Sequence, residues 1–404
     1  MRSLAVISMH TSPLVLPGSG DSGGMNVYVR ELVSGLAQAG VESTVYVRRW
    51  RTDLPTEVEV EPGFRVVHVD AGRPELAKHE LYDIADEFAE GIAHRFASGE
   101  DVDALHANYW LSGVVGHRLK HEFGLPLVST FHTLARVKAI SGEREPRRRD
   151  EAEAEVIGCS DVILASCETE AAQLVEHYGA RPERIEIVPP GVDHAFFSPG
   201  DRRGARRALG LGDHPVLLFV GRIQPLKGLP VAIKTLALLE DWSDAHLLVV
   251  GGPSGPAGHG ELELAYRLVR GLGLVDRVRF VEPQPHHLLS TYYRAADVCL
   301  VPSRSESFGL VALEAAACGT PVVAANVGGL TTLVDHGVTG FLVEERDPEA
   351  FARYVREILV SPSLADALGA EATRRSRRYT WSTTAGRLRR IYSDLTVRRL
   401  VSCA

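Results

Sequence analysis

The side chains best suited to chemistry gather in one short stretch, around Glu306 and Glu314. An apolar strand, Val298–Val301, ends just before it, and a helix is predicted from about residue 308 to 318. Its first turn would present unpaired N–H groups at the carboxyl end of a strand, where α/β sheets bind anions. The two carboxylates suit the hydroxyls of a sugar and a ribose, with a phosphate between them. The alternative is a helix N-terminal charge at Glu306 and a surface residue at Glu314.

A second charged loop follows the apolar strand Val216–Val220. It carries Arg222 and Lys227, which the strand would display at its carboxyl end. Two cations there would complement a diphosphate and stabilise the charge that it gains as a leaving group. The alternative is an ordinary solvated loop, because charged residues are common in such connections.

A glycine-rich loop near the N-terminus precedes the first predicted helix. It contains Asp21, Gly23, Gly24 and Asn26. Paired glycines before a helix let backbone N–H groups approach a phosphate closely, and an asparagine amide can bind a hydroxyl. The loop lacks the G-x-G-x-x-G order of a dinucleotide site, so a flexible loop is the alternative.

Four further residues gain interest mainly from their positions. Tyr109 and His132 each follow an apolar strand, which places them at one edge of the sheet. A histidine is usually structural or exposed, and this chain has 16. Lys78 and Arg149 lie in helical stretches, where solvation at the surface is the ordinary expectation.

The elements that position these residues alternate between short apolar strands and longer amphipathic helices, a pattern typical of parallel α/β sheets. Strands are predicted at residues 4–9, 41–47, 64–69, 104–106, 126–130, 162–165, 185–188, 216–220, 246–250, 278–281, 298–301, 322–325 and 341–343. We expect one α/β domain over residues 1–192, a second over 193–380, and a C-terminal helix over 381–404 that packs back on the first domain; the family resemblance described below implies that the first binds the acceptor and the second the nucleotide sugar.

Composition excludes several classes of protein. The chain has 404 residues, enough for two cores, and a formal charge of −8, which gives no electrostatic reason to expect nucleic acid as a partner. No apolar run approaches the ~18 residues of a membrane span. Five scattered cysteines without a close pair of metal-ligand spacing predict reduced thiols, and we expect a cytoplasmic protein.

These motifs together resemble a known family. The residues are Gly221, Arg222, Lys227 and Gly228, then Glu306 and Glu314 separated by seven residues, with the paired glycines near the N-terminus. They resemble the retaining glycosyltransferases of family 4, whose GT-B fold has two Rossmann-like α/β domains facing across a cleft. The resemblance covers nearly the whole chain. It is strongest to the mycothiol-pathway branch, which transfers N-acetylglucosamine from UDP to an inositol monophosphate.

The resemblance implies a role for each residue of the donor site. Arg222 and Lys227 would hold the diphosphate, Glu306 the sugar hydroxyls and Glu314 the ribose, while His132 would contact the sugar. The catalytic set is then His132, Glu306, Arg222 and Lys227. The remaining donor-site residues would be Gly23, Gly24, Arg304, Ser307, Phe308, Gly309 and Leu310.

The acceptor roles follow in the same way. In the family a lysine, a tyrosine, a threonine and an arginine hold the acceptor phosphate, which here implies Lys78, Tyr109, Thr133 and Arg149. Asp21 and Asn26 would also contact the acceptor. A structural magnesium ion, away from the chemistry, would lie near Tyr293, Arg294, Ala296 and Thr320. No catalytic metal or other cofactor is expected. The sequence leaves open whether the protein is a monomer or a homodimer.

The sequence departs from the family beside both substrates. Arg304 replaces a smaller or aromatic residue, and residues 131–136 and 143–149 are atypical. A different nucleotide sugar, such as a GDP-sugar in an antibiotic pathway, and a carboxylate acceptor are therefore alternatives. A sugar-nucleotide sensor without activity is a third. No motif carboxylate is an evident nucleophile, so we expect front-face attack after closure of the cleft, with the diphosphate accepting the proton.

Overall fold

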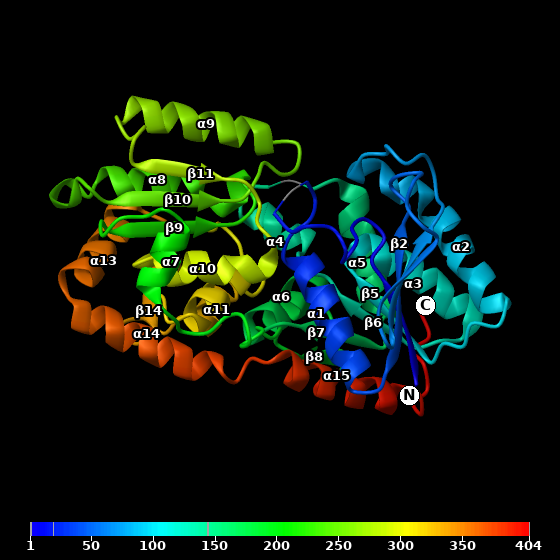
Figure 1. Ribbon diagram of the computed structural model, residues 1–404. Coiled ribbons are helices and arrows are strands. Elements are labelled where there is room, and N and C mark those ends of the chain that lie inside the picture. Colours follow the sequence, from blue (N-terminus) through cyan, green and yellow to red (C-terminus); the bar gives the residue numbers. More distant parts are fainter. Residues whose placement is uncertain (1, 19, 144, 404) are drawn as a thin grey trace. The chain divides into compact units, whose positions relative to one another are not determined.

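A computed structural model describes residues 2–18, 20–143 and 145–403 of the chain (Figure 1). The chain divides into two compact units. The first consists of Met1–Val15, Met25–Gly191 and Trp381–Ala404, and the second of Leu16–Gly24 and Val192–Thr380. The glycine-rich loop thus belongs to the second unit, although it lies near the start of the chain.

The first unit contains an eight-stranded sheet with the order β3-β4-β2-β1-β5-β6-β7-β8. All neighbouring strands are parallel except β3 and β4, which are antiparallel. The strands are β1 Ser3–Ile7, β2 Glu42–Arg48, β3 Glu57–Glu61, β4 Phe64–Val69, β5 Ala104–Asn108, β6 Leu127–Thr130, β7 Val162–Ala165 and β8 Ile185–Ile187. The helices are α1 Gly24–Gln38, η1 Lys78–Ile84, α2 Ala85–Ala97, α3 Trp110–Phe123, α4 Ala135–Ile140, α5 Arg147–Cys159, α6 Glu168–Tyr178, η2 Pro182–Arg184 and α15 Trp381–Leu395.

Both faces of this sheet are buried. Successive residues of a strand point to opposite faces of the sheet, and in this sheet each face is covered by an apolar cluster. In β1, Ala5 and Ile7 join one apolar cluster, whereas Leu4 and Val6 join another. The C-terminal helix α15 packs with α1 in the second of these clusters (Figure 1). Its Tyr392 hydroxyl lies 2.8 Å from Nδ1 of the buried His106 in β5, so this helix belongs to the core.

The second unit contains a six-stranded parallel sheet with the order β11-β10-β9-β12-β13-β14. The strands are β9 Val216–Val220, β10 His246–Val250, β11 Val278–Val281, β12 Val298–Val301, β13 Val322–Ala325 and β14 Gly340–Val343. The helices are α7 Arg202–Ala208, η3 Pro225–Lys227, α8 Leu229–Ala237, η4 Glu240–Trp242, α9 Gly258–Gly271, η5 His286–Leu288, α10 Leu289–Ala295, α11 Leu310–Ala317, α12 Leu330–Leu333, α13 Pro348–Val360 and α14 Pro362–Ser376. Each unit is therefore a Rossmann-like α/β domain, as predicted.

Two features of the fold differ from the sequence predictions. β3 was not predicted, because its alternating Glu-Val pattern lies at a half-exposed sheet edge. The prediction of reduced thiols was also wrong for two cysteines, since the structure joins Cys159 and Cys403 in a disulfide across 244 residues. Among the described residues, no helix is both long and apolar enough to cross a bilayer.

Candidate functional site

Two loops of the second unit are locked together at the carboxyl ends of β9 and β12. Gly228 has φ +73°, and a Cβ there would lie 2.2 Å from the Pro302 carbonyl oxygen. The Arg304 N–H donates to the Leu226 carbonyl over 2.8 Å. Only glycine permits this close approach at a left-handed backbone position. The loop bearing Arg222 and Lys227 therefore has a fixed position relative to the loop bearing Glu306.

The predicted cation and carboxylate meet directly in this pair of loops. Lys227 Nζ donates to Glu306 Oε2 over 2.6 Å, and Ser303 Oγ donates to the same oxygen over 3.2 Å. Both side chains of the ion pair are about one-fifth exposed, at 20% and 18%. The ammonium has three N–H donors, so it can hold Glu306 and a ligand oxygen together.

The glycine-rich loop packs against the same loops. A Cβ on Gly23 would lie 2.9 Å from Arg222 Nε, and one on Gly24 would lie 3.5 Å from Leu310 Cδ1. The loop is held by the Gly252 N–H, which donates to the Gly18 carbonyl over 3.0 Å. Gly23, Gly24, Arg222 and Leu310 therefore come together, although roughly 200 residues separate the glycines from the arginine in the sequence.

The helix after β12 begins two residues later than predicted. α11 spans Leu310–Ala317, and Gly309 is its N-cap with φ +102°. Ser307 and Phe308 thus lie in the loop and not in the helix. The Leu310 side chain at the start of α11 lies beside Gly24, and a short loop separates this helix start from Glu306. An anion at the first N–H groups of α11 would be stabilised by the helix dipole.

Glu314 is buried and held by two side chains. His286 Nε2 lies 2.7 Å from Oε1, and the Tyr293 hydroxyl donates to Oε2 over 2.7 Å. The alternative of a surface glutamate is therefore wrong. Burial, followed by the charge of Glu314, raises the pKa of Tyr293 well above its usual value, so the phenol stays a donor. No sequence signal identified His286, which precedes Glu314 by 28 residues.

Arg304 lies at the exposed edge of this loop, near Arg346 and Glu261. Burial raises the pKa of Glu261, and the two arginines oppose that effect. Arg346 has φ +54° and donates from Nε to the Pro302 carbonyl over 3.1 Å, which is the carbonyl that contacts Gly228.

A pair of glycines that the sequence analysis missed supports the Glu306 loop. The Gly329 N–H donates to the Glu306 carbonyl over 2.9 Å. A Cβ on Gly328 would lie 2.0 Å from that carbonyl oxygen, and one on Gly329 would lie 2.4 Å from the Phe308 Cα. Backbone contacts of this kind leave no mark on hydrophobic periodicity, so only the fold reveals them.

Gly328→Ala is expected to displace the Glu306 loop. A left-handed alanine costs roughly 1 kcal/mol and an overpacked contact a further 1–3 kcal/mol. Gly337→Ala is the matched control, because Gly337 has φ +75°, but a Cβ there would meet no atom of the described residues within 4 Å. Calorimetry should show a larger loss of melting temperature for Gly328→Ala. An equal loss of melting temperature in the two variants would show that the close contact between Gly328 and the Glu306 carbonyl does not matter for stability.

The first unit brings a second set of residues together, at the carboxyl ends of β5 and β6. Tyr109, with φ +77°, follows β5, and His132, with φ +60°, follows β6. Left-handed backbone is uncommon outside glycine and concentrates at functional sites. Both residues were predicted at this edge, and the structure confirms that position.

The four residues predicted to hold an acceptor phosphate form one cluster, in which Lys78 and Arg149 lie over the Tyr109 ring and Thr133 is bonded to Arg149. Lys78 Nζ lies 4.6 Å from the ring centroid and Arg149 Cζ lies 5.0 Å from it. Arg149 Nη2 donates to both the carbonyl and the Oγ1 of Thr133, each over 3.0 Å. The expectation of a solvated surface position for Arg149 is wrong, because its side chain is only 2% exposed.

Arg149 is held by a buried network. Its Nε donates to Glu153 Oε1 over 2.7 Å, and its Nη1 lies 2.9 Å from Glu145 Oε1. Burial alone would lower the pKa of Arg149, but Tyr109, Glu153 and Glu145 outweigh it and raise that pKa. The guanidinium is thus a permanent cation beside Tyr109.

His132 is a neutral polar group in this unit. Its Nε2 lies 2.9 Å from Asn108 Oδ1, and burial lowers its pKa to about 3. Asn108 is fully buried, and its Nδ2 has no hydrogen-bond partner among the described residues. The sequence analysis did not select Asn108, although its position at the end of β5 was a usable signal.

Two predicted acceptor residues have other surroundings. Asp21 lies in the loop that belongs to the second unit, and its contact with the acceptor stays a prediction. The Asn26 amide is buried and donates to Thr11 Oγ1 and to the Ser12 carbonyl, both over 2.6 Å. Asn26 therefore fixes the loop after β1.

The structural magnesium ion predicted near Tyr293, Arg294, Ala296 and Thr320 stays a prediction. Arg294, Ala296 and Thr320 line a cavity of about 770 Å³, which is also lined by Arg202, Arg374, Asp213, Asp297 and Asp366. Magnesium prefers carboxylate and water oxygens. The four predicted residues supply no carboxylate, and Thr320 Oγ1 already donates to the Tyr293 carbonyl over 2.7 Å. We assign no step to a metal here.

Comparison with known proteins identifies a family for each half of the chain. Residues 22–196 match the family Glycosyltransferase Family 4, and residues 201–375 match the family Glycosyl transferases group 1. D-inositol 3-phosphate glycosyltransferase of Streptosporangium roseum is 46% identical over 402 residues, covering 96% of this chain and 92% of the relative. The protein of the same name from Geodermatophilus obscurus is 47% identical, covering 97% and 89%.

Solved structures give the same fold. Sucrose-phosphate synthase from Thermosynechococcus elongatus superposes with a TM-score of 0.91 at 32% identity and covers 98% of this chain and 99% of that one. Anabaena Alr3699/HepE, solved with UDP and glucose, superposes at 0.80 with 18% identity over 98% and 100%. The chain is therefore a glycosyltransferase with the GT-B fold, and it belongs to family 4, in the same family as the D-inositol 3-phosphate glycosyltransferases.

Proposed function

We propose that this enzyme transfers N-acetylglucosamine from UDP-N-acetylglucosamine to inositol monophosphate with retention of the anomeric configuration. The observation that carries this proposal is the cluster of Lys78, Tyr109, Thr133 and Arg149, where two cations flank one aromatic ring. Such a cluster suits a small phosphorylated acceptor, because Lys and Arg donors bind phosphate oxygens through charge-assisted hydrogen bonds. The relatives named D-inositol 3-phosphate glycosyltransferase support the same acceptor.

The donor would bind to the second unit. The diphosphate would be held by Arg222, Lys227 and the first N–H groups of α11. Gly23 and Gly24 pack against this region, and because they have no side chains they would leave space for the diphosphate. Glu306 would accept hydrogen bonds from hydroxyls of the sugar, and Glu314 would accept them from hydroxyls of the ribose. Stabilising the departing diphosphate with fixed charges lowers the barrier without a metal-dependent step. The acceptor hydroxyl would attack from the face of the leaving group and give its proton to the diphosphate.

A phosphorylated hexose is a second candidate acceptor. The likeness to sucrose-phosphate synthase, at 32% identity over nearly the whole chain, favours it. The same Lys78 and Arg149 cluster would bind its phosphate, so the two candidates differ only in the ring that carries the attacking hydroxyl.

The test is a donor and acceptor panel read in two assays. Thermal shift with UDP, GDP and ADP reports the base, because a ligand that binds only the folded state raises the melting temperature. Turnover of UDP-N-acetylglucosamine with inositol phosphate, a hexose 6-phosphate or unphosphorylated inositol reports the acceptor. We expect stabilisation by UDP and turnover with inositol phosphate only. Stabilisation by GDP alone, turnover of unphosphorylated inositol, or no transfer from any donor would overturn the proposal.

A further inference from the structure

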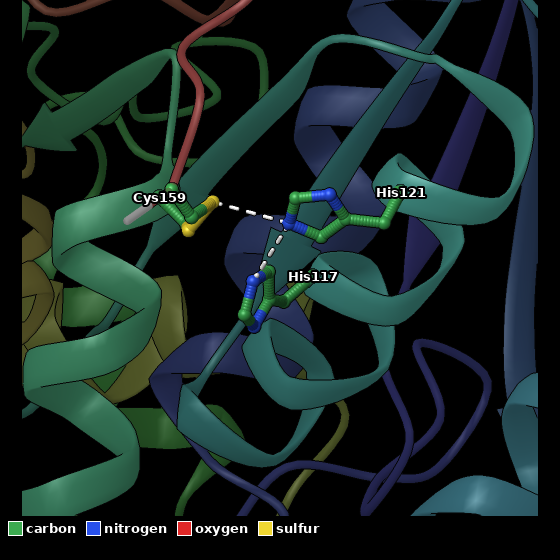
Figure 2. Close-up of side chains that lie close together, drawn as sticks. His117, His121 and Cys159 are labelled. Carbon is green, nitrogen blue, oxygen red and sulfur yellow. Dashed lines mark hydrogen bonds between the residues drawn. A yellow bond between two sulfur atoms is a disulfide. The ribbon is translucent and has the colours of Figure 1, made fainter.

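A cluster in the first unit, which includes the two disulfide cysteines but no residue assigned to the donor or the acceptor, has the composition of a metal site. It consists of His117 and His121 on α3, Cys159 at the end of α5, and Cys403 near the C-terminus. The four candidate ligand atoms lie within 4.8 Å of one another. Figure 2 shows His117 and His121, from successive turns of α3, beside Cys159, with one dashed line between the two imidazoles and another from His121 to a sulfur of the disulfide.

The distances approach those of a tetrahedral zinc ion. His117 Nε2 lies 3.0 Å from His121 Nε2, and His121 Nε2 lies 3.1 Å from Cys403 Sγ. Bonds of about 2.0–2.3 Å to zinc would put two nitrogens about 3.3 Å apart and a nitrogen and a sulfur about 3.5 Å apart. Small side-chain rotations thus suffice for the nitrogens, and breaking the disulfide would let the sulfurs separate.

The surroundings supply the support that a metal site needs. His117 Nδ1 lies 3.5 Å from Glu155 Oε1, and a carboxylate behind a ligating histidine is the usual arrangement in such sites. Asp161 Oδ1 accepts from the Val401 N–H over 2.7 Å, which holds the segment carrying Cys403 beside α5. The buried Lys120 Nζ lies 2.8 Å from Asp161 Oδ2 and 2.7 Å from the Cys159 carbonyl.

We propose that in the reduced chain His117, His121, Cys159 and Cys403 bind one Zn²⁺ ion. A disulfide explains the two sulfurs but not the two imidazoles that converge on them. The cluster offers two histidines four residues apart on one helix and two thiolates. Such nitrogen and sulfur ligands bind zinc more tightly than they bind harder cations such as magnesium or calcium. A phosphine reduces the Cys159–Cys403 disulfide with two electrons and leaves as its oxide, with the oxygen and both thiol protons coming from water, whereas a thiol reductant supplies the electrons and protons and leaves as its own disulfide. Zinc then displaces one proton from each of the two cysteine thiols. The ion would tie the C-terminal segment to α3 and α5.

Zinc binding to the untagged chain, reduced with a phosphine and freed of metal, tests the proposal. We expect about one zinc per chain by elemental analysis and five titratable thiols in denaturant, against no zinc and three thiols for the oxidised chain. His121→Gln and Cys403→Ser should each abolish stoichiometric binding, and Glu155→Gln should weaken it about 10- to 100-fold. His94→Gln, an exposed histidine on α2, is the matched control and should bind like the parent.

Cobalt absorption separates these ligands from adventitious binding. Co²⁺ in the reduced chain should give an intense tetrahedral spectrum with a sulfur charge-transfer band, lost in Cys403→Ser. His121 is exposed, so its replacement leaves no buried cavity, and the melting temperature of each metal-free variant verifies its fold. Substoichiometric zinc in the fully reduced chain, or zinc retained by both His121→Gln and Cys403→Ser, would overturn the proposal.

Discussion

Lys227→Met should lower kcat by about 100- to 1,000-fold, the usual cost of removing one preorganised group that stabilises developing charge. Lys227 Nζ lies at the carboxyl end of β9, in the loop fixed to Pro302 by the close approach of Gly228. It is therefore held in place before the donor arrives. Methionine keeps the length and apolar stem of the side chain and removes only the charge.

The loss of stability from breaking the Lys227–Glu306 ion pair must be distinguished from the loss of kcat. Both partners are partly exposed, so losing the pair should cost only about 0–1 kcal/mol of stability. The double variant Lys227→Met with Glu306→Gln leaves no unpaired charge, and its melting temperature should return to that of the parent while kcat stays low. Lys234→Met, an exposed lysine on α8, is the control and should keep full activity. Recovery of kcat in the double variant would mean that Lys227→Met lost activity because the Glu306 carboxylate was left unpaired, and not because a charge that stabilises the diphosphate was missing.

The parallel strands were predictable because they are apolar runs between polar loops. The predicted bounds of β4, β7, β9, β10, β11, β12 and β13 agree with the structure, and the residues after β9 and β12 belong to the predicted donor site. β3 lacks this signal because it is an alternating edge strand. Helix bounds depended on backbone detail, as at Gly309, whose left-handed conformation delays α11 by two residues.

The parts of the site that depend on long-range contact could not be predicted from local pattern. Lys78 and Arg149 were identified only by resemblance, since a charged residue in a helix ordinarily points to water. Gly328 acts through a backbone contact with Glu306, and His286 through a hydrogen bond to Glu314. Cys403 approaches the ligands on α3 only because the chain returns to the first unit after Thr380.

Arg149→Met should lower both stability and acceptor binding, whereas Lys78→Met should affect binding alone. Removing Arg149 leaves the fully buried Glu153 with one partner fewer, and breaking a buried ion pair typically costs about 3–5 kcal/mol. Thr133 loses the donor that fixes its carbonyl and hydroxyl. Lys78 is half-buried and contacts the face of Tyr109, so its loss should raise the acceptor KM with little change in melting temperature.

The matched control for Arg149 lies two residues away on α5. Arg147 pairs with Glu151 at i+4, but its side chain is 90% exposed, and Arg147→Met should cost at most about 0.5 kcal/mol. Tryptophan fluorescence in urea follows the relevant unfolding, because Trp50, Trp110 and Trp381 lie in the first unit.

Glu153→Gln added to Arg149→Met should restore part of the lost stability, because the amide removes the unpaired buried charge. Ala135 N–H donates to Glu153 Oε2 over 2.8 Å, and a glutamine oxygen can still accept that bond. Acceptor KM should stay high in this double variant, since the cation beside Tyr109 is absent. If Arg149→Met unfolds at the same urea concentration as Arg147→Met, the buried network does not stabilise the unit. If acceptor KM is unchanged in both Arg149→Met and Lys78→Met, the Tyr109 cluster does not bind the acceptor phosphate.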